Sequence, residues 1–206
     1  MNFKKIILYR EPAISEINID ALVVFLQENF PIKVEIKDNV FKEFSLENIK
    51  KLSNIRITDI KSSFSEHKSS DDEIKFERKL CEDSSLMDST TKVENTQQIS
   101  DVFMYDGFEL QKILRYLSED SEILHIILTN RLTCTFDEND NRYHGRAVIC
   151  ANPSIISTTG IVEAPAKPKE YYFEVMKLKT QGLDIKSAKE KYKGKFLEYN
   201  DKRLTK

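Results

Sequence analysis

Side chains that could perform acid–base or metal chemistry are concentrated in one stretch of the chain, residues 124–172. This stretch holds two of the three histidines and two of the three cysteines. Its apolar, strand-like runs alternate with short polar loops, the usual arrangement for a site built at strand ends. An unconventional hydrolase site around a hairpin at 131–144 would use the candidate residues His125, Arg131, Asp137, Asp140 and His144.

Each of these features also has a purely structural explanation. His125 lies in an apolar run that predicts a central strand, where a buried histidine hydrogen-bonded to the backbone is an ordinary finding. His144 and the acidic residues before it could titrate or bind a cation, yet Asp and Asn residues are equally typical of a solvated hairpin turn. Cys134 and Cys150 fall on predicted strands, which favours buried, inert thiols. The functional and structural alternatives both stay open for these residues.

The motifs of the common hydrolases and nucleotide-binding proteins are absent from the sequence. The usual zinc peptidase carries HExxH on a helix, because that spacing places two imidazoles beside one metal with a glutamate as base. The histidines of this chain are at 67, 125 and 144, so no two are three or four residues apart. The turn at 157–160 offers hydroxyls and amides, but it lacks the glycine pattern of a phosphate-binding loop or a nucleophile elbow. The sequence therefore predicts no metal ligand set and no cofactor.

Length and charge restrict the class of protein. A chain of 206 residues fits one domain, and a net charge of −2 gives no basic footprint for nucleic acid. Residues 165–206 carry twelve Lys and Arg against six Asp and Glu, which indicates a solvated basic face or a partner surface. No apolar run approaches the roughly 18 residues that span a bilayer, and the three cysteines show no CxxC spacing. We expect a cytoplasmic protein with reduced thiols, without a nucleic-acid or membrane partner; the sequence leaves its oligomeric state open.

Hydrophobic periodicity predicts an α/β fold with an α+β tendency. A mixed sheet would begin with a β-α-β unit, carry an edge hairpin and be followed by C-terminal helices. The glycine at 160 is expected to permit a positive φ between two apolar pairs. The predicted strands are Lys5–Tyr9, Ile32–Ile36, Ile55–Ile60, Ile123–Leu128, Leu132–Phe136 and Tyr143–Ala151, and the predicted helices are Ile19–Phe30, Ser45–Leu52, Gly107–Leu117, Lys169–Thr180 and Ile185–Tyr192.

The segment 61–100 differs in composition from the rest of the predicted single domain, 1–206. Ser, Asp, Glu, Lys and Thr dominate it, and no hydrophobic period is sustained. Such composition is typical of a mobile insertion. His67 and Cys81 lie inside it, so neither is expected to contribute to a site.

The runs LTNRLTCTFDENDNRYHGRAVIC (128–150) and PSIISTTGIVEAPAKPKEYY (153–172) resemble an archaeal family of metallopeptidases. That family is in turn distantly similar to the archaemetzincins, a branch of the metzincin zinc peptidases. The likeness is strongest over Ile123–Tyr172 and extends weakly to the β-α-β start and to 194–199. It implies a metzincin-like layout, in which an edge strand binds extended peptide by backbone pairing. Either Leu132–Phe136 or Tyr143–Ala151 would be the matching strand.

The resemblance also implies what is missing. Archaemetzincins carry HExxHxxGxxH after the sheet, and this chain ends at Lys206, where that segment would begin. Zinc is the cofactor of the wider family, but no ligand can be carried over to a position here. We therefore expect a metallopeptidase-like protein without a working zinc site, a pseudoenzyme that binds peptide or is a structural remnant. The alternatives are the hydrolase with a polar site at 131–144, or a chain whose missing segment another protein supplies.

Overall fold

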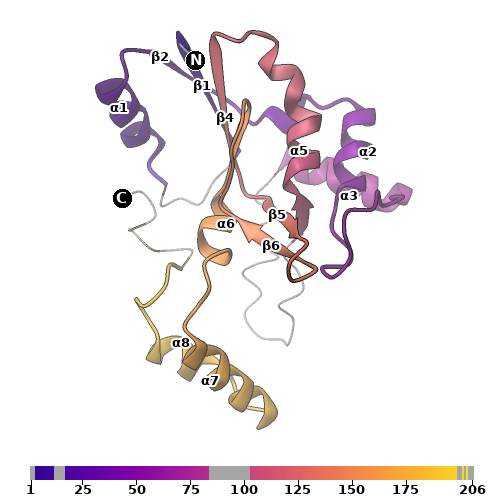
Figure 1. Ribbon diagram of the computed structural model, residues 1–206, viewed down its shortest axis with the longest axis vertical. Coiled ribbons are helices and arrows are strands. Elements are labelled where there is room, and N and C mark those ends of the chain that lie inside the picture. The colour runs from indigo at the N-terminus through magenta and orange to yellow at the C-terminus, as the bar shows by residue number, and fades with distance from the viewer. Residues whose placement is uncertain (1–2, 12–16, 84–102, 199–200, 202, 204–206) are drawn as a thin grey trace.

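The computed structural model describes residues 3–11, 17–83, 103–198, 201 and 203, which form an α+β fold with two sheets (Figure 1). The strands are β1 Lys5–Arg10, β2 Lys33–Lys37, β3 Met104–Asp106, β4 Ile123–Thr129, β5 Leu132–Asp137, β6 Arg142–Arg146, β7 Val148–Ile149 and β8 Ser154–Ser157. The larger sheet has the order β2-β1-β4-β8-β7, and the smaller sheet has the order β3-β5-β6.

The larger sheet is mixed, as the sequence predicts. Strands β2, β1, β4 and β8 run parallel, while β7 pairs antiparallel with β8 at the edge. The predicted β-α-β start is confirmed, because helix α1 (Ile19–Asn29) connects β1 to its parallel neighbour β2. Strand β4 is central, as its nearly continuous apolar run predicts, because it lies between β1 and β8.

Helices cover the two sides of the larger sheet unequally. The remaining helices are α2 Leu46–Asn54, α3 Asp71–Glu82, α5 Gly107–Leu114, α6 Thr158–Glu163, α7 Lys169–Thr180 and α8 Lys186–Lys191, with 3-10 turns at Val40–Glu43 and Arg115–Glu119. Helices α2, α3 and α5 lie on one side, and α1 lies on the other (Figure 1). The main core includes Ile127, Ile155, Leu52 and Leu110, whereas α1 has no fully buried residue.

Local side chains begin these helices where the sequence predicts. The Asn18 side chain accepts a hydrogen bond from the backbone N–H of Ala21, and Ser45 accepts one from Asn48. Asp106 accepts from the first amides of α5. Each of these caps satisfies backbone donors that have no partner within the helix itself.

The segment 61–100, which the sequence predicts as a mobile insertion, contains a helix. Asp71–Glu82 is helix α3, which begins with a capping box between Ser70 and Glu73. The Ser70 backbone amide and hydroxyl lower the pKa of Glu73 to about 2. Leu80 and Cys81 are fully buried, and Ile74 packs against the main core, so apolar positions anchor a helix that is otherwise rich in charged residues. Residues 84–100 of this segment lie outside the described residues.

The predicted hairpin forms but belongs to the smaller sheet. Strands β5 and β6 pair antiparallel, with Thr135 opposite His144. Strand β5 lies between β3 and β6, so of the two alternatives for the edge strand Leu132–Phe136 is excluded; Tyr143–Ala151 contains β6 and β7, which are both edge strands. The strand predicted at Ile55–Ile60 is reduced to an isolated bridge between Arg56 and Tyr105.

Gly160 is required by close packing and not by a positive φ, which corrects the expectation from the sequence. It lies inside helix α6, and its φ is not among the positive values of the described residues. A Cβ at this position would lie 2.2 Å from the backbone oxygen of Arg146. Only glycine therefore lets α6 approach the end of β6 this closely.

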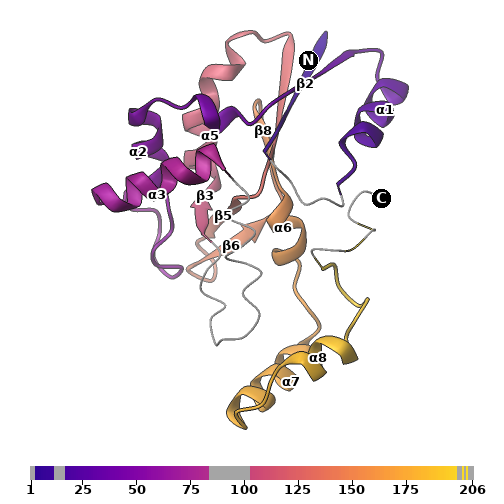
Figure 2. The ribbon, with the colours of Figure 1, turned by 180° about the vertical axis from the view of Figure 1, so that it is seen from behind.

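The C-terminal helices form a separate small cluster. Tyr171 of α7 packs on Ala188 and Tyr192 at the end of α8. Figures 1 and 2 both show this helical hairpin extending away from the two sheets. None of the helices that the structure describes combines the length and the apolar character needed to cross a membrane.

Candidate functional site

The carboxyl ends of β1 and β4 meet where the larger sheet reverses its direction of growth. From β1 the chain crosses to β2 on one side, while β4 and then β8 extend the sheet on the other side. Ligand sites of parallel sheets commonly occupy the crevice at such a switch point. Here Glu11 follows β1, and Asn130 and Arg131 follow β4.

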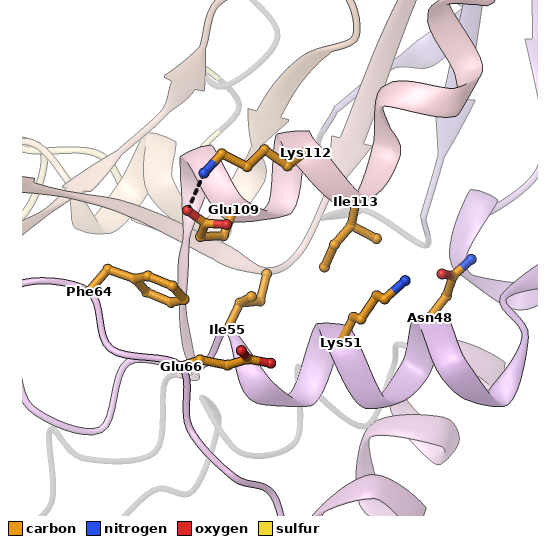
Figure 3. A pocket seen from close by; sticks show the side chains of 8 residues that line it. All are labelled: Asn48, Lys51, Ile55, Phe64, Glu66, Glu109, Lys112 and Ile113. Atoms are coloured by element: carbon orange, nitrogen blue, oxygen red, sulfur yellow. Dashed lines mark hydrogen bonds and ion pairs between the residues drawn. The ribbon is translucent and has the colours of Figure 1, made fainter.

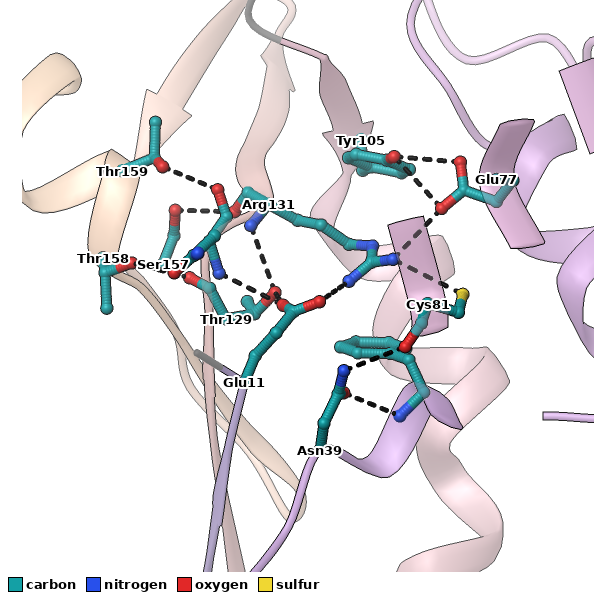
Figure 4. A network of polar contacts seen from close by, with 12 residues as sticks. Glu11, Asn39, Glu77, Cys81, Tyr105, Thr129, Arg131, Ser157, Thr158 and Thr159 are labelled. Carbon is teal, nitrogen blue, oxygen red and sulfur yellow. Dashed lines mark hydrogen bonds and ion pairs between the residues drawn. The ribbon is translucent and has the colours of Figure 1, made fainter. Parts of the chain in front are cut away.

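These residues begin a network of buried charges, shown in Figure 4. The Glu11 carboxylate accepts hydrogen bonds from the Thr129 hydroxyl, from the Asn130 backbone N–H at 3.2 Å and from Nη1 of Arg131. Nη2 of Arg131 donates to Oε1 of Glu77, on α3, at 3.2 Å. Arg131, Glu11 and Glu77 are each almost completely buried.

A second arginine completes the network around Glu77. Nε of Arg56 donates to Oε2 of Glu77 at 2.8 Å, and the Tyr105 hydroxyl donates to the same oxygen at 3.0 Å. Glu11, Glu77, Arg56 and Arg131 carry no net charge as a set. We call these four residues with Tyr105 the buried charge network. Its ionic groups are matched, which is the condition for retaining charges in a protein interior.

The electrostatics of the network keep its guanidinium groups charged and its neighbouring thiol neutral. Burial alone lowers the pKa of Arg131, but the charges of Glu11 and Glu77 outweigh it and hold that pKa above the ordinary value. Burial raises the pKa of Cys81 to about 12. Cys81 is thus not an activated nucleophile, even though Nη2 of Arg131 lies 3.5 Å from its sulfur.

The hydroxyl groups of residues 157–159 form hydrogen bonds with the turn that contains Arg131. Ser157 donates to the Arg131 carbonyl oxygen at 2.7 Å, Thr158 to the Thr129 carbonyl oxygen at 3.1 Å, and Thr159 to the Asn130 carbonyl oxygen at 2.6 Å. The sequence offers these hydroxyls at a turn that lacks the glycine pattern of a phosphate-binding loop. The Thr158 hydroxyl also has the Asn130 side-chain oxygen within 3.0 Å. All three hydroxyls thus have acceptors within the protein, and they hold the turn after β4 in place.

Three of the five candidate residues from the sequence come together where β5, the following turn and β6 meet. Ligand atoms of Asp137, Asp140 and His144 all lie within 4.8 Å of one another. We call this group the hairpin triad. Nε2 of His144 lies 2.8 Å from Oδ2 of Asp140, and their side chains are 36% and 47% exposed. The backbone amide of Asn139 lowers the pKa of Asp137, so this carboxylate remains ionised at neutral pH.

His125 and Arg131 do not join the hairpin triad. Nδ1 of His125 lies 3.1 Å from the Tyr9 hydroxyl inside the larger sheet, and burial lowers the pKa of the imidazole. Nε2 of His125 has no partner among the described residues. Arg131 is committed to the buried charge network. The structure thus divides the predicted polar site into three separate places.

The sequence did not indicate Glu77, Arg56 or Tyr105 as members of a site. Glu77 lies in the segment expected to be mobile, and it meets Arg131 across a separation of 54 residues. The one local signal is Glu11, a carboxylate directly after an apolar strand. A single sequence carries no mark of such long-range pairing.

One comparison with known proteins finds a match. A family model described as "Probable metallopeptidase family (DUF6775)" matches residues 2–206. No curated protein and no solved structure matches the chain. Because the family match covers nearly the whole sequence, the chain belongs to this probable metallopeptidase family.

Proposed function

We propose that this chain is a metallopeptidase-family protein that binds extended peptide at strand β7 and does not build a two-histidine zinc centre. One observation supports the second half of the proposal: among the described residues, the cluster of possible metal ligands holds a single histidine, His144. Nε2 of His67 pairs with Glu73 at 3.0 Å, His125 pairs with Tyr9, and His144 pairs with Asp140. The usual zinc peptidase needs at least two imidazoles on one ion.

Strand β7 supports the peptide-binding half, because it is one of the two edge strands of the larger sheet, with β2 at the other edge, and it lies within the expected strand Tyr143–Ala151. On the outer side of β6, the Tyr143 backbone N–H already donates to the Ile60 oxygen at 2.8 Å. Just before β7, the Ala147 backbone oxygen accepts a hydrogen bond from the N–H of Ser157, in the neighbouring strand β8. Antiparallel alternation then directs the N–H and C=O of Val148 outward. The Val148 residue is 47% exposed, so an extended peptide could pair there.

A proline at position 148 tests this pairing. Val148→Pro removes the outward N–H, and we expect it to weaken binding of a fluorescein-labelled peptide, Lys-Val-Thr-Val-Thr-Val-Lys, at least about tenfold, as loss of a main-chain hydrogen bond in a dry interface would. Fluorescence anisotropy measures the dissociation constant. Val148→Thr, which keeps the N–H and the β-branched shape, is the matched control. Equal affinity of the proline variant and this control would rule out pairing at β7.

The hairpin triad favours a second candidate, a metal-dependent hydrolase. One imidazole nitrogen and two carboxylates are donors that a divalent cation accepts, and three protein ligands leave a position for water. The donor set fits such an ion, and Asp137, Asp140 and His144 would hold it. A bound Zn²⁺ would supply Lewis acidity and a water of lowered pKa. The triad's own residues offer the exposed position that a substrate would need.

Metal binding at the triad is tested with Zn²⁺ alone. If the second candidate is right, equilibrium dialysis should give one ion per chain, and His144→Ala should weaken binding at least about tenfold through loss of one ligand. His67→Ala is the matched control, since His67 also pairs with a carboxylate but lies outside the triad. Cleavage of a quenched fluorescent peptide that a chelator abolishes would favour the hydrolase. Saturable peptide binding without cleavage by zinc-loaded protein would favour the first proposal.

A further inference from the structure

A groove between α2 and α5 has features of a ligand site that neither the β7 edge nor the hairpin triad explains. Its volume is about 320 Å³, within the range of small-molecule pockets. Its centre is apolar and consists of Ile55, just after α2, and Ile113 of α5. Phe64 lies at one end and is 37% exposed, so it offers a ring face to an occupant.

Lys51 and Glu66, which carry opposite charges, lie at opposite ends of this groove. Figure 3 shows Glu66 near Phe64, and Lys51 and Asn48 at the far end beyond the isoleucines. Glu109, also near Phe64, is already paired with Lys112 at 2.6 Å. A carboxylate bound beside the Lys51 ammonium and the Asn48 amide would gain charge-assisted hydrogen bonds. An ammonium beside Glu66 would gain the same at the other end.

The existing ion pairs of the rim can be exchanged at small cost. Lys51 pairs with Glu47 at 2.7 Å, but their side chains are 53% and 76% exposed. Such surface pairs contribute little to stability, so a ligand can replace them. Glu66 accepts one hydrogen bond from Nδ2 of Asn54 at 3.0 Å. A carboxylate has further lone pairs for an ammonium.

We propose that this groove binds a short apolar peptide with free termini, whose ammonium and carboxylate are far enough apart to reach both ends of the groove. Its carboxylate lies at Lys51 and Asn48, its ammonium lies at Glu66, and its apolar side chain lies on Ile55, Ile113 and Phe64. The proposal does not depend on β7 or on a metal. It gives a member of a probable metallopeptidase family a second place that recognises peptide ends.

Calorimetric titration of the full chain with leucyl-leucine tests the proposal. We expect saturable binding, and we expect N-acetyl-leucyl-leucine and leucyl-leucine amide to bind at least about tenfold more weakly, because each lacks one terminal charge. A parallel titration with leucine tests whether the ligand must span the groove. Leucine carries both charges on one carbon, so it should bind more weakly than leucyl-leucine.

Variants locate the binding in the groove. Lys51→Met and Glu66→Gln should each weaken leucyl-leucine binding about tenfold, and the glutamine can still accept the hydrogen bond from Asn54. Lys50→Met is the matched control, because Lys50 is exposed on the same helix but does not line the groove. Three results would overturn the proposal: no heat of binding up to about 10 mM ligand, equal binding of the capped dipeptides, or equal effects of Lys51→Met and Lys50→Met.

Discussion

Replacing Arg131 by methionine is expected to lower the free energy of unfolding by about 3–5 kcal/mol, the usual cost of removing one partner from a buried ion pair. Arg131 is fully buried and neutralises part of the charge of Glu11 and Glu77. Methionine fills a similar volume, so the loss of stability comes mainly from Glu11 and Glu77, whose carboxylates stay buried without the guanidinium that neutralised them. Urea denaturation followed by circular dichroism measures the change.

Two controls separate this effect from a general effect of losing an arginine. Arg142→Met removes an exposed guanidinium at the start of β6 and should change the stability by less than about 0.5 kcal/mol. The double variant Arg131→Met with Glu11→Gln should lose less stability than the sum of its single changes, because it removes one stranded carboxylate. If Arg131→Met were as stable as Arg142→Met, the ion pairs would contribute nothing.

Replacing Leu80 by alanine is expected to cost about 2–5 kcal/mol of unfolding free energy. Leu80 is completely buried, although helix α3 is dominated by charged residues. Truncation would leave a cavity where α3 packs against α2 and the 3-10 turn at 40–43. Thermal and urea denaturation both report the loss.

The control for Leu80 is its neighbour Lys79, which is exposed on the same helix. Lys79→Ala exchanges one good helix former for another and should change stability by less than about 0.5 kcal/mol. A Leu80→Ala variant as stable as Lys79→Ala would mean that α3 is not part of the folded core. That result would restore the expectation of a mobile insertion for 71–82.

The buried charge network links these two predictions. Glu77, one turn before Leu80 and Cys81, carries α3 into contact with Arg131 at the carboxyl end of β4. Helix α3 is therefore held by an apolar anchor and by an ionic one. Removing either anchor should weaken the other, and the two effects should not add independently because both act on one helix.

The sequence by itself determined the local elements of this protein. The periods of Lys5–Tyr9, Ile19–Phe30, Ile123–Leu128 and Lys169–Thr180 predicted strands and helices that the structure confirms within a few residues. Caps such as Asn18 and Ser45 were readable for the same reason. Periodicity and capping depend on residues close together in the chain, so a single sequence contains them.

The sequence also placed Asp137, Asp140 and His144 near one another, because a tight hairpin turn brings together residues that are close in the chain. Helix α3 was not predicted, because its few apolar residues give no sustained hydrophobic period. Only the tertiary structure shows that Leu80 and Cys81 are buried.

Only the tertiary structure decided how distant segments combine. It placed β5 inside a second sheet, separated His125 from His144, and assembled Glu11, Glu77 and Arg131 across up to 120 residues of sequence. It also explains why position 160 needs a glycine: any Cβ there would clash with the backbone oxygen of Arg146, which no local pattern shows. The physical reason is that a buried charge is tolerated only beside its partner, and sheet pairing brings that partner from elsewhere in the chain.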